Sequence, residues 1–509
     1  MNIREQLNSI AEERIIILDG GVGSTIQALN LREDDFRGSE FANHTSPLEG
    51  CNDLLCLTRP GAIGAIHDAY LEAGADIIET CSFNSTSISL SDYGLSELSY
   101  EISKAAAQIT RKSTDRYSTD LRRRFTAGSI GPTPKGASLY PDINNPGKRS
   151  ITWDELEAAY YDNARGLLDG GADIFLVETV FDTLNAKAAL FAISRLLEER
   201  QIDVPVMISA TLSSDAGRLL SGQNLEAFCI SVQHVKPWSI GINCSTNALK
   251  LFPFVQMLSD IAPCYVSAYP NAGAPNKFGR YEEMPEEMSS NVESYFKEEL
   301  VNVIGGCCGT NPAHIAKIAE KAQGYKPRKI KSKQKRFSFS GLEQYYTADN
   351  VINPETNEDL IQAINEGEYE DAADIARDMI DDGQAILNIK TDDEKALSAF
   401  LDYALLNPYV SKAPFMINST DFNVLQAGLK RLQGRGIAGP VNLKDGEIEF
   451  IKKVQIIQRY GAAAYVTLVD ENGAAETEEQ KSELLERVYQ LLKENNCSEE
   501  NIILEHCLD

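Results

Sequence analysis

The first 325 residues repeat one pattern, in which a short apolar run, a turn and an amphipathic segment follow one another. Such runs are typical of buried strands, and strict alternation of strands with helices requires a parallel sheet. Eight units in this length predict a closed (β/α)8 TIM barrel, with a doubly wound open sheet as the alternative. No Gly-x-Gly-x-x-Gly fingerprint follows a predicted strand, which favours the barrel. The predicted strands are 15–18, 76–78, 125–127, 174–177, 206–209, 239–242, 265–268 and 301–304.

Three cysteines follow two of these predicted strands. Cys307 and Cys308 lie in a Gly-Gly-Cys-Cys-Gly turn after the eighth strand, and Cys244 follows the sixth. Three thiolates fill three positions of a tetrahedral zinc site and leave the fourth open for a substrate, as in catalytic zinc sites. Buried free cysteines in an apolar core are the alternative. The glycine-rich turn, with a further cysteine at another strand end, favours a metal.

Acidic residues follow three other predicted strands. Asp19 comes after the first strand, Glu79 after the second and Glu178 after the fourth. In a barrel these positions meet at the C-terminal face, where active sites lie. A single acid at a strand end can simply cap the next helix. Several acids beside three thiols instead predict a pocket for a substrate that carries an amino group.

The charge balance excludes some classes of partner. The chain has 509 residues, a formal net charge of −27 and a pI of about 4.7. This argues against nucleic acid and against an anionic membrane surface as partners. No apolar run reaches the length of a membrane span, and the first residues lack the apolar core of a secretory signal. Ten cysteines without such a signal predict a cytoplasmic protein with reduced thiols.

A basic stretch separates this first region from a second one. We predict a barrel domain over 1–325, a solvated basic linker over 326–340 and an α/β domain over 341–509. The second domain has five or six strand–helix units, too few for a closed barrel, so we expect an incomplete barrel with covered edges. Its predicted strands are 385–389, 415–417, 438–443, 465–469 and 502–504, with a further candidate at 345–351.

Several motifs resemble a known family, the cobalamin-dependent methionine synthases. The first 325 residues are similar to their homocysteine-binding module, and the second domain is more loosely similar to their pterin (folate)-binding module. The motifs that carry the resemblance are Leu-Asp-Gly-Gly-Val-Gly-Ser at 18–24, Asp-Phe-Arg-Gly at 35–38, Ala-Gly-Ala-Asp-Ile-Ile-Glu-Thr at 73–80, Phe-Asn-Ser-Thr at 83–86, Glu-Thr-Val-Phe-Asp-Thr at 178–183, Asn-Cys at 243–244 and Gly-Gly-Cys-Cys-Gly-Thr at 305–310.

The resemblance implies a zinc ion held by Cys244, Cys307 and Cys308, with homocysteine sulfur in the open position. Zinc coordination makes the bound sulfur a thiolate at neutral pH, and this thiolate would accept a methyl group to form methionine. The resemblance also implies five homocysteine-binding residues. Asp19 and Glu178 would hold the ammonium group, the backbone N–H groups of the turn that includes Gly20 and Gly21 would bind the carboxylate, and Glu79 would orient neighbouring loops.

The second domain departs from its family pattern. The family's folate-binding positions correspond to Asn388, Asp392 and Asn418, where two family acids are replaced by amides, and Lys390 lies between them. An amide cannot carry the charge of a carboxylate or accept a proton in its place. We therefore predict a degenerate site that no longer binds methyltetrahydrofolate productively.

The sequence gives less direct evidence for the identity of the methyl donor. None of the five histidines lies in an Asp-x-His-x-x-Gly corrinoid signature. We expect methylcobalamin to be supplied in trans, by a separate corrinoid protein or module. One alternative is transfer from a small methylsulfonium or betaine donor. Another is that the chain serves as an interaction scaffold for a corrinoid protein.

Overall fold

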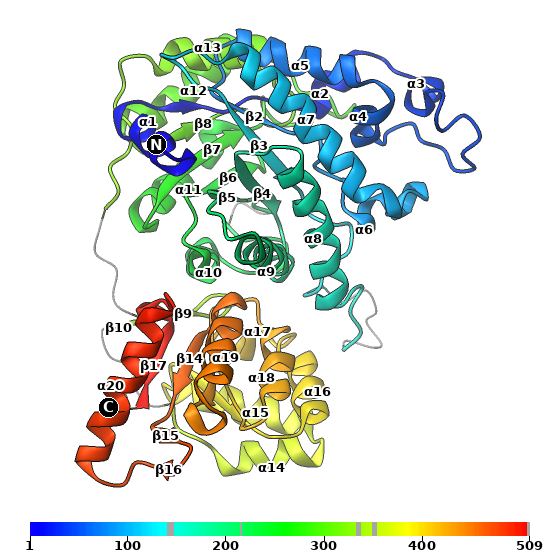
Figure 1. Cartoon of the computed structure of the whole chain (residues 1–509). Helices are drawn as coiled ribbons and strands as arrows, with labels where there is room; N and C mark the ends of the chain where they lie inside the picture. Colours follow the sequence, from blue (N-terminus) through cyan, green and yellow to red (C-terminus); the bar gives the residue numbers. More distant parts are fainter. Residues whose placement is uncertain (140–146, 214–215, 332–336, 349–353, 506–509) are drawn as a thin grey trace. The chain divides into compact units, whose positions relative to one another are not determined.

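The structure is a computed structural model that describes residues 1–139, 147–213, 216–331, 337–348 and 354–505 (Figure 1). The chain forms two compact units. The first comprises Met1–Lys135, Asp154–Leu220 and Lys236–Ser332, and the second Gly136–Trp153, Ser221–Val235 and Lys333–Asp509. Two segments of the first 325 residues thus group with the second unit, and the predicted boundary at residue 325 stays a prediction.

The first unit contains a parallel sheet of eight strands in the order β1-β8-β7-β6-β5-β4-β3-β2. All eight predicted strands are present. A bridge between Leu18 and Ile77 joins β1 to β2, so the sheet is a nearly closed barrel, as predicted. The strands are β1 (Ile16–Ile17), β2 (Ile77–Glu79), β3 (Phe125–Ile130), β4 (Ile174–Val180), β5 (Val206–Ala210), β6 (Ser239–Cys244), β7 (Tyr265–Pro270) and β8 (Val303–Ile304).

Helices connect successive strands of this barrel (Figure 1). The first helix begins at a capping box formed by Asn2 and Glu5 and buries Leu7 and Ala11 in the same apolar cluster as the barrel strands. The helices of this unit are α1 (Ile3–Glu13), α2 (Val22–Ala28), α3 (Glu33–Arg37), α4 (Leu55–Thr58), α5 (Pro60–Glu72), α6 (Ser87–Leu90), α7 (Ser99–Tyr117), α8 (Trp153–Asp169), α9 (Thr183–Arg200), α11 (Ala248–Ile261), α12 (Pro285–Lys297) and α13 (Pro312–Ala322).

The second unit is built on a five-stranded parallel sheet in the order β11-β12-β13-β14-β17. The prediction of an incomplete barrel-like α/β domain is therefore confirmed. Its strands are β11 (Leu387–Lys390), β12 (Phe415–Asn418), β13 (Ile437–Val441), β14 (Ala463–Val466) and β17 (Ile502–Leu504), and a small antiparallel pair is formed by β15 (Val469–Asp470) and β16 (Gly473–Ala474). Its helices are α10 (Leu225–Val232), α14 (Glu358–Glu366), α15 (Tyr369–Asp381), α16 (Glu394–Ala404), α17 (Pro408–Ser411), α18 (Phe422–Leu429), α19 (Glu447–Arg459) and α20 (Glu478–Glu494).

The predicted linker at 326–340 has buried residues at both ends, while Lys326 and residues 329–331 are exposed, as expected of a tether. Arg328 is buried and donates to carbonyl groups of Ser259 and Cys264. At the other end, β9 (Phe337–Ser340) pairs antiparallel with β10 (Tyr345–Ala348). The candidate strand at 345–351 is thus a hairpin strand outside the parallel sheet, and its residues 349–351 lie outside the described residues.

The hairpin contributes to the core of the second unit. Phe337 and Phe339 are fully buried and pack against Met416 and other residues from four strands of the parallel sheet. Their period-2 alternation with serine suits a strand that has one buried face. The basic composition of 326–336 gave no sign of this short pattern, so the prediction extended the linker over residues 337–340.

A substitution in β9 tests this role. Phe339→Leu should lower the free energy of unfolding of the second unit by about 1 kcal/mol, because leucine fills the buried site less completely. The matched control is Tyr345→Leu, at a side chain that is 53% exposed, and it should change stability by less than about 0.5 kcal/mol. Chemical denaturation measures both, and equal stabilities would support the tether instead.

Within the described ranges, each helix is either too short or too polar to span a bilayer.

Candidate metal centre

Three thiols meet at the C-terminal end of the barrel. Cys244 is the last residue of β6, and Cys307 and Cys308 follow β8 after two glycines. Their sulfur atoms all lie within 4.8 Å of one another, and Cys244 Sγ is 3.8 Å from Cys308 Sγ. In a tetrahedral site with Zn–S bonds of about 2.3 Å, neighbouring sulfurs are about 3.8 Å apart. The spacing of this pair therefore suits a single metal ion.

Backbone contacts fix the turn that carries two of these thiols. The N–H of Cys307 donates to Pro270 O at 2.9 Å, and the N–H of Cys308 donates to Asn271 Oδ1 at 3.1 Å. Gly309 has φ +81°, and a Cβ there would lie 2.2 Å from the Cβ of Tyr281. Only glycine fits at this position, so the Cys-Cys-Gly order is a packing requirement as well as a motif.

The third thiol lies on a strained backbone. Cys244 and Ser245 both have left-handed φ values, +55° and +57°, which non-glycine residues rarely adopt. The Ser245 hydroxyl accepts a hydrogen bond from Leu212 N at 2.7 Å and so helps to hold this conformation. Strained residues cluster at functional sites, which supports a functional role for this strand end.

The three thiols share their protons unequally. Hydrogen bonds from Cys244 and then Cys307 hold the pKa of Cys308 well below its usual range, although burial opposes this shift. The same contacts with Cys244 and Cys308, together with burial, raise the pKa of Cys307. A thiolate therefore forms readily among the three sulfurs, and thiolates are the form that binds metals.

Two of the predicted acids lie together beside the barrel closure. Asp19 is buried, its Oδ2 accepts a hydrogen bond from Glu79 N at 3.0 Å, and its Oδ1 has no partner within the described ranges. Burial is the main cause that raises the pKa of both carboxyls, and the charge of Glu178 adds to it. A buried carboxyl oxygen without a partner, beside acids with raised pKa values, suits a cationic group.

A β-bulge in β4 sets the orientation of the third predicted acid, Glu178. The register between β4 and β5 shifts between Val177 and Val180, and Thr179 within this shift has φ +55°. Bulges re-aim side chains next to active sites. Glu178 is buried and accepts a hydrogen bond from the Ser129 hydroxyl, and burial raises its pKa to about 7.

Two asparagines belong to this site although sequence reasoning gave them no role. Asn243 Oδ1 accepts a hydrogen bond from Thr179 N at 3.0 Å, while its Nδ2 lies 3.8 Å from Cys307 Sγ. It therefore joins the bulge that carries Glu178 to the cysteine turn. Asn271 supports Cys308, as described above. The strand-end position of Asn243, beside Cys244, was the signal in the sequence that could have identified it.

The predicted glycine turn packs against the cysteine turn. Gly21 N donates to Thr310 Oγ1 at 2.9 Å, and a Cβ on Gly21 would lie 2.6 Å from Cys307 O. A Cβ on Gly20 would lie 2.7 Å from the same threonine oxygen. Both glycines are therefore needed for close packing, and the N–H of Gly21 is already paired before any substrate binds.

The predicted folate residues of the second unit also lie together. Asn388 Nδ2 donates to Pro354 O at 2.9 Å, and its Oδ1 accepts from Asn418 Nδ2 at 3.2 Å. Asp392 accepts hydrogen bonds from Ser419 and Thr420 at the end of β12, and the Ser419 bond lowers its pKa. These polar groups are occupied largely within the protein, and Lys390 is exposed at the same end of β11.

This architecture defines a barrel enzyme in which three thiols able to hold a metal share one strand-end face with three acidic side chains. The homocysteine S-methyltransferase family model matches residues 16–322, and the pterin binding enzyme model matches residues 351–504. The first match spans more than half of the chain. The chain belongs to the homocysteine S-methyltransferase family, and its second unit carries the pterin-binding match.

Solved structures with some similarity include two forms of the homocysteine methyltransferase MmuM from Escherichia coli. The metallated form is 22% identical, with a TM-score of 0.49, over 63% of this chain and 100% of that chain. The apo form is 20% identical, with a TM-score of 0.44, over 61% and 96%. The carboxyl transferase domain of Rhizobium etli pyruvate carboxylase is 12% identical, with a TM-score of 0.34, over 63% and 50%.

Proposed function

We propose that this protein is a zinc-dependent homocysteine S-methyltransferase of the methionine synthase type. It forms methionine with a methyl group from methylcobalamin on a separate module or protein. The observation that carries the proposal is the set of three thiols, Cys244, Cys307 and Cys308, at the strand ends of a barrel in this family.

The donor set fits zinc better than the other common metals. Thiolate ligands favour zinc, copper(I) and iron–sulfur clusters, whereas magnesium, calcium and manganese favour oxygen ligands. Cys244, Cys307 and Cys308 would hold the zinc and leave one coordination position for a substrate sulfur, which the metal would keep as a thiolate at neutral pH. Homocysteine has one thiol, which matches this single open position.

The chain's own residues bind and orient the amino acid. Asp19 and Glu178 are assigned to the ammonium group, because Asp19 Oδ1 has no partner within the described ranges and both carboxyls are buried. Glu79 is linked to Asp19 through its N–H and helps to place the loop after β2. An ammonium group among these carboxyls would favour their charged forms.

Methyl transfer forms a bond between homocysteine sulfur and the methyl carbon, while the bond to the donor breaks and leaves its electron pair on the donor. The direct test incubates the zinc-loaded full chain with homocysteine and one donor at a time: methylcobalamin, a methylsulfonium salt or betaine. We expect methionine from methylcobalamin. Methionine from the sulfonium or betaine donor without any corrinoid would overturn this donor assignment. If the chain neither retained zinc after loading nor turned over any donor, the interaction scaffold would be favoured.

A separate prediction concerns the second unit. We expect no saturable micromolar binding of methyltetrahydrofolate to the full chain. Asn388 and Asn418 stand where the family has acids, and their amides pair with each other. Isothermal titration calorimetry measures this, with Asn388→Ala as the paired variant. Micromolar binding that disappears in Asn388→Ala would show that the folate site is functional.

A further inference from the structure

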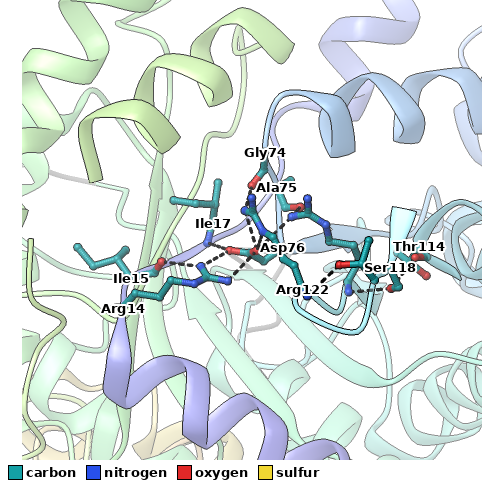
Figure 2. Close-up of polar contacts among 11 residues, drawn as sticks. Arg14, Ile15, Ile17, Gly74, Ala75, Asp76, Thr114, Ser118 and Arg122 are labelled. Carbon is teal, nitrogen blue, oxygen red and sulfur yellow. Dashed lines mark hydrogen bonds and ion pairs between the residues drawn. The ribbon is translucent and has the colours of Figure 1, made fainter. Parts of the chain in front are cut away.

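Three arginines converge on one buried carboxylate where β1 and β2 begin, at the opposite end of these strands from Asp19 and Glu79. Asp76 is 1% exposed and forms ion pairs with Arg14 at 2.7 Å, Arg122 at 2.8 Å and Arg124 at 3.1 Å. Figure 2 shows Arg14 and Arg122 meeting at this carboxylate, which also accepts the N–H of Ile17. One negative charge thus faces three positive charges.

The cluster keeps an excess of positive charge and unused donors. Burial alone would raise the pKa of Asp76, but hydrogen bonds from Arg14 hold this pKa below its ordinary value, so the carboxylate stays charged. Within the described ranges, Arg14 Nε and Arg122 Nη1 have no hydrogen-bond partner, and the buried Arg124 Nε is also unpartnered. Arginine donors of this kind bind carboxylate or phosphate oxygens.

A cavity of about 500 Å³ opens beside Arg14 and Arg122. Its walls are mostly apolar and include Ile17 and, from α13, Ala316 and Ala319. The carboxylate of Glu320, which also lines it, lies 3.3 Å from Lys317, so its charge is offset. A mostly apolar cavity of this size with a few placed polar groups is the usual form of a small-molecule site.

We propose that this cavity binds a small organic oxyanion, a carboxylate or a phosphate monoester. Its charged end pairs with Arg14 and Arg122, and its compact apolar body lies along the alanines of α13. A bound oxyanion would neutralise part of the positive charge that remains after Asp76 pairs with the three arginines. The site uses none of the thiols or acids at the C-terminal face of the barrel, so it is separate from the proposed methyltransferase site.

The test is isothermal titration calorimetry on the full chain with phenyl phosphate, benzoate and inorganic phosphate. We expect one equivalent of phenyl phosphate or benzoate to bind, more tightly than inorganic phosphate, and the preferred probe tells a phosphate ester from a carboxylate. Arg122→Gln should weaken binding about tenfold or more through loss of a charge-assisted contact. Asp76 keeps Arg14 and Arg124 in this variant.

Two further variants keep the result interpretable. Ala316→Trp, at an exposed position on the cavity wall, should weaken binding of the aromatic probes but not of inorganic phosphate. Arg377→Gln removes the same charge from an arginine in the second unit that pairs with Asp374, and it should leave binding unchanged. Absence of saturable binding by the wild type would overturn the proposal. So would equal affinities for the wild type, Arg122→Gln and Ala316→Trp.

Discussion

Cys307→Ser is expected to lose the bound metal and to form methionine at least about a thousandfold more slowly than the wild type. Zinc binds thiolates, and a serine hydroxyl at this turn cannot replace the sulfur. A bound metal supplies several kcal/mol of stabilisation to the reacting group, and each 1.4 kcal/mol is about tenfold in rate. Elemental analysis gives the metal content, and turnover with methylcobalamin and homocysteine gives the rate.

The matched control is Cys264→Ser, which removes a thiol from the same unit but outside the metal-binding group. It should keep the metal and the rate. If Cys307→Ser also kept one metal per chain and full turnover, the three thiols would be buried free cysteines, and the zinc proposal would fail.

Glu178→Gln is expected to stabilise the metal-free reduced protein at neutral pH while it weakens homocysteine binding. Burial raises the pKa of Glu178 from 4.5 to about 7 in the folded chain. At pH values between 4.5 and about 7, the folded state therefore binds more protons than the unfolded state. The contribution of Glu178 to the free energy of unfolding falls as pH rises through this range. Glutamine has no charge to bury, so the variant should be more stable above pH 7, by about 2–3 kcal/mol.

Chemical denaturation at pH 5 and pH 8 measures this difference. The stability gained by Glu178→Gln should be small at pH 5 and large at pH 8, whereas Glu101→Gln, at an exposed position on α7, should show no such difference. Homocysteine binding by the same variant should weaken, because one carboxylate for the ammonium group is gone. Unchanged binding together with unchanged stability would remove Glu178 from the site.

The barrel could be predicted because its signal is local. Most strands contain a short run of apolar residues, and the helices between them have their own periodicity, so the alternation can be predicted without tertiary contacts. The positions of Cys244, Cys307 and Cys308 followed from the same rule, since strand ends in a parallel barrel meet at one face. Strand β9 was missed, although its partner β10 had been a candidate strand, because two phenylalanines are a weaker signal than the basic residues that precede them.

The sequence by itself determined the alternation of strands and helices and the thiols that lie at strand ends, because these depend on neighbours along the chain. Tertiary structure alone decided the partners of Asn243 and the convergence of Arg14, Arg122 and Arg124 on Asp76. Arg14 and Asp76 are 62 positions apart in the chain, and Asn243 and Thr179 are 64 apart. Such contacts depend on which strands become neighbours, and no local pattern encodes them.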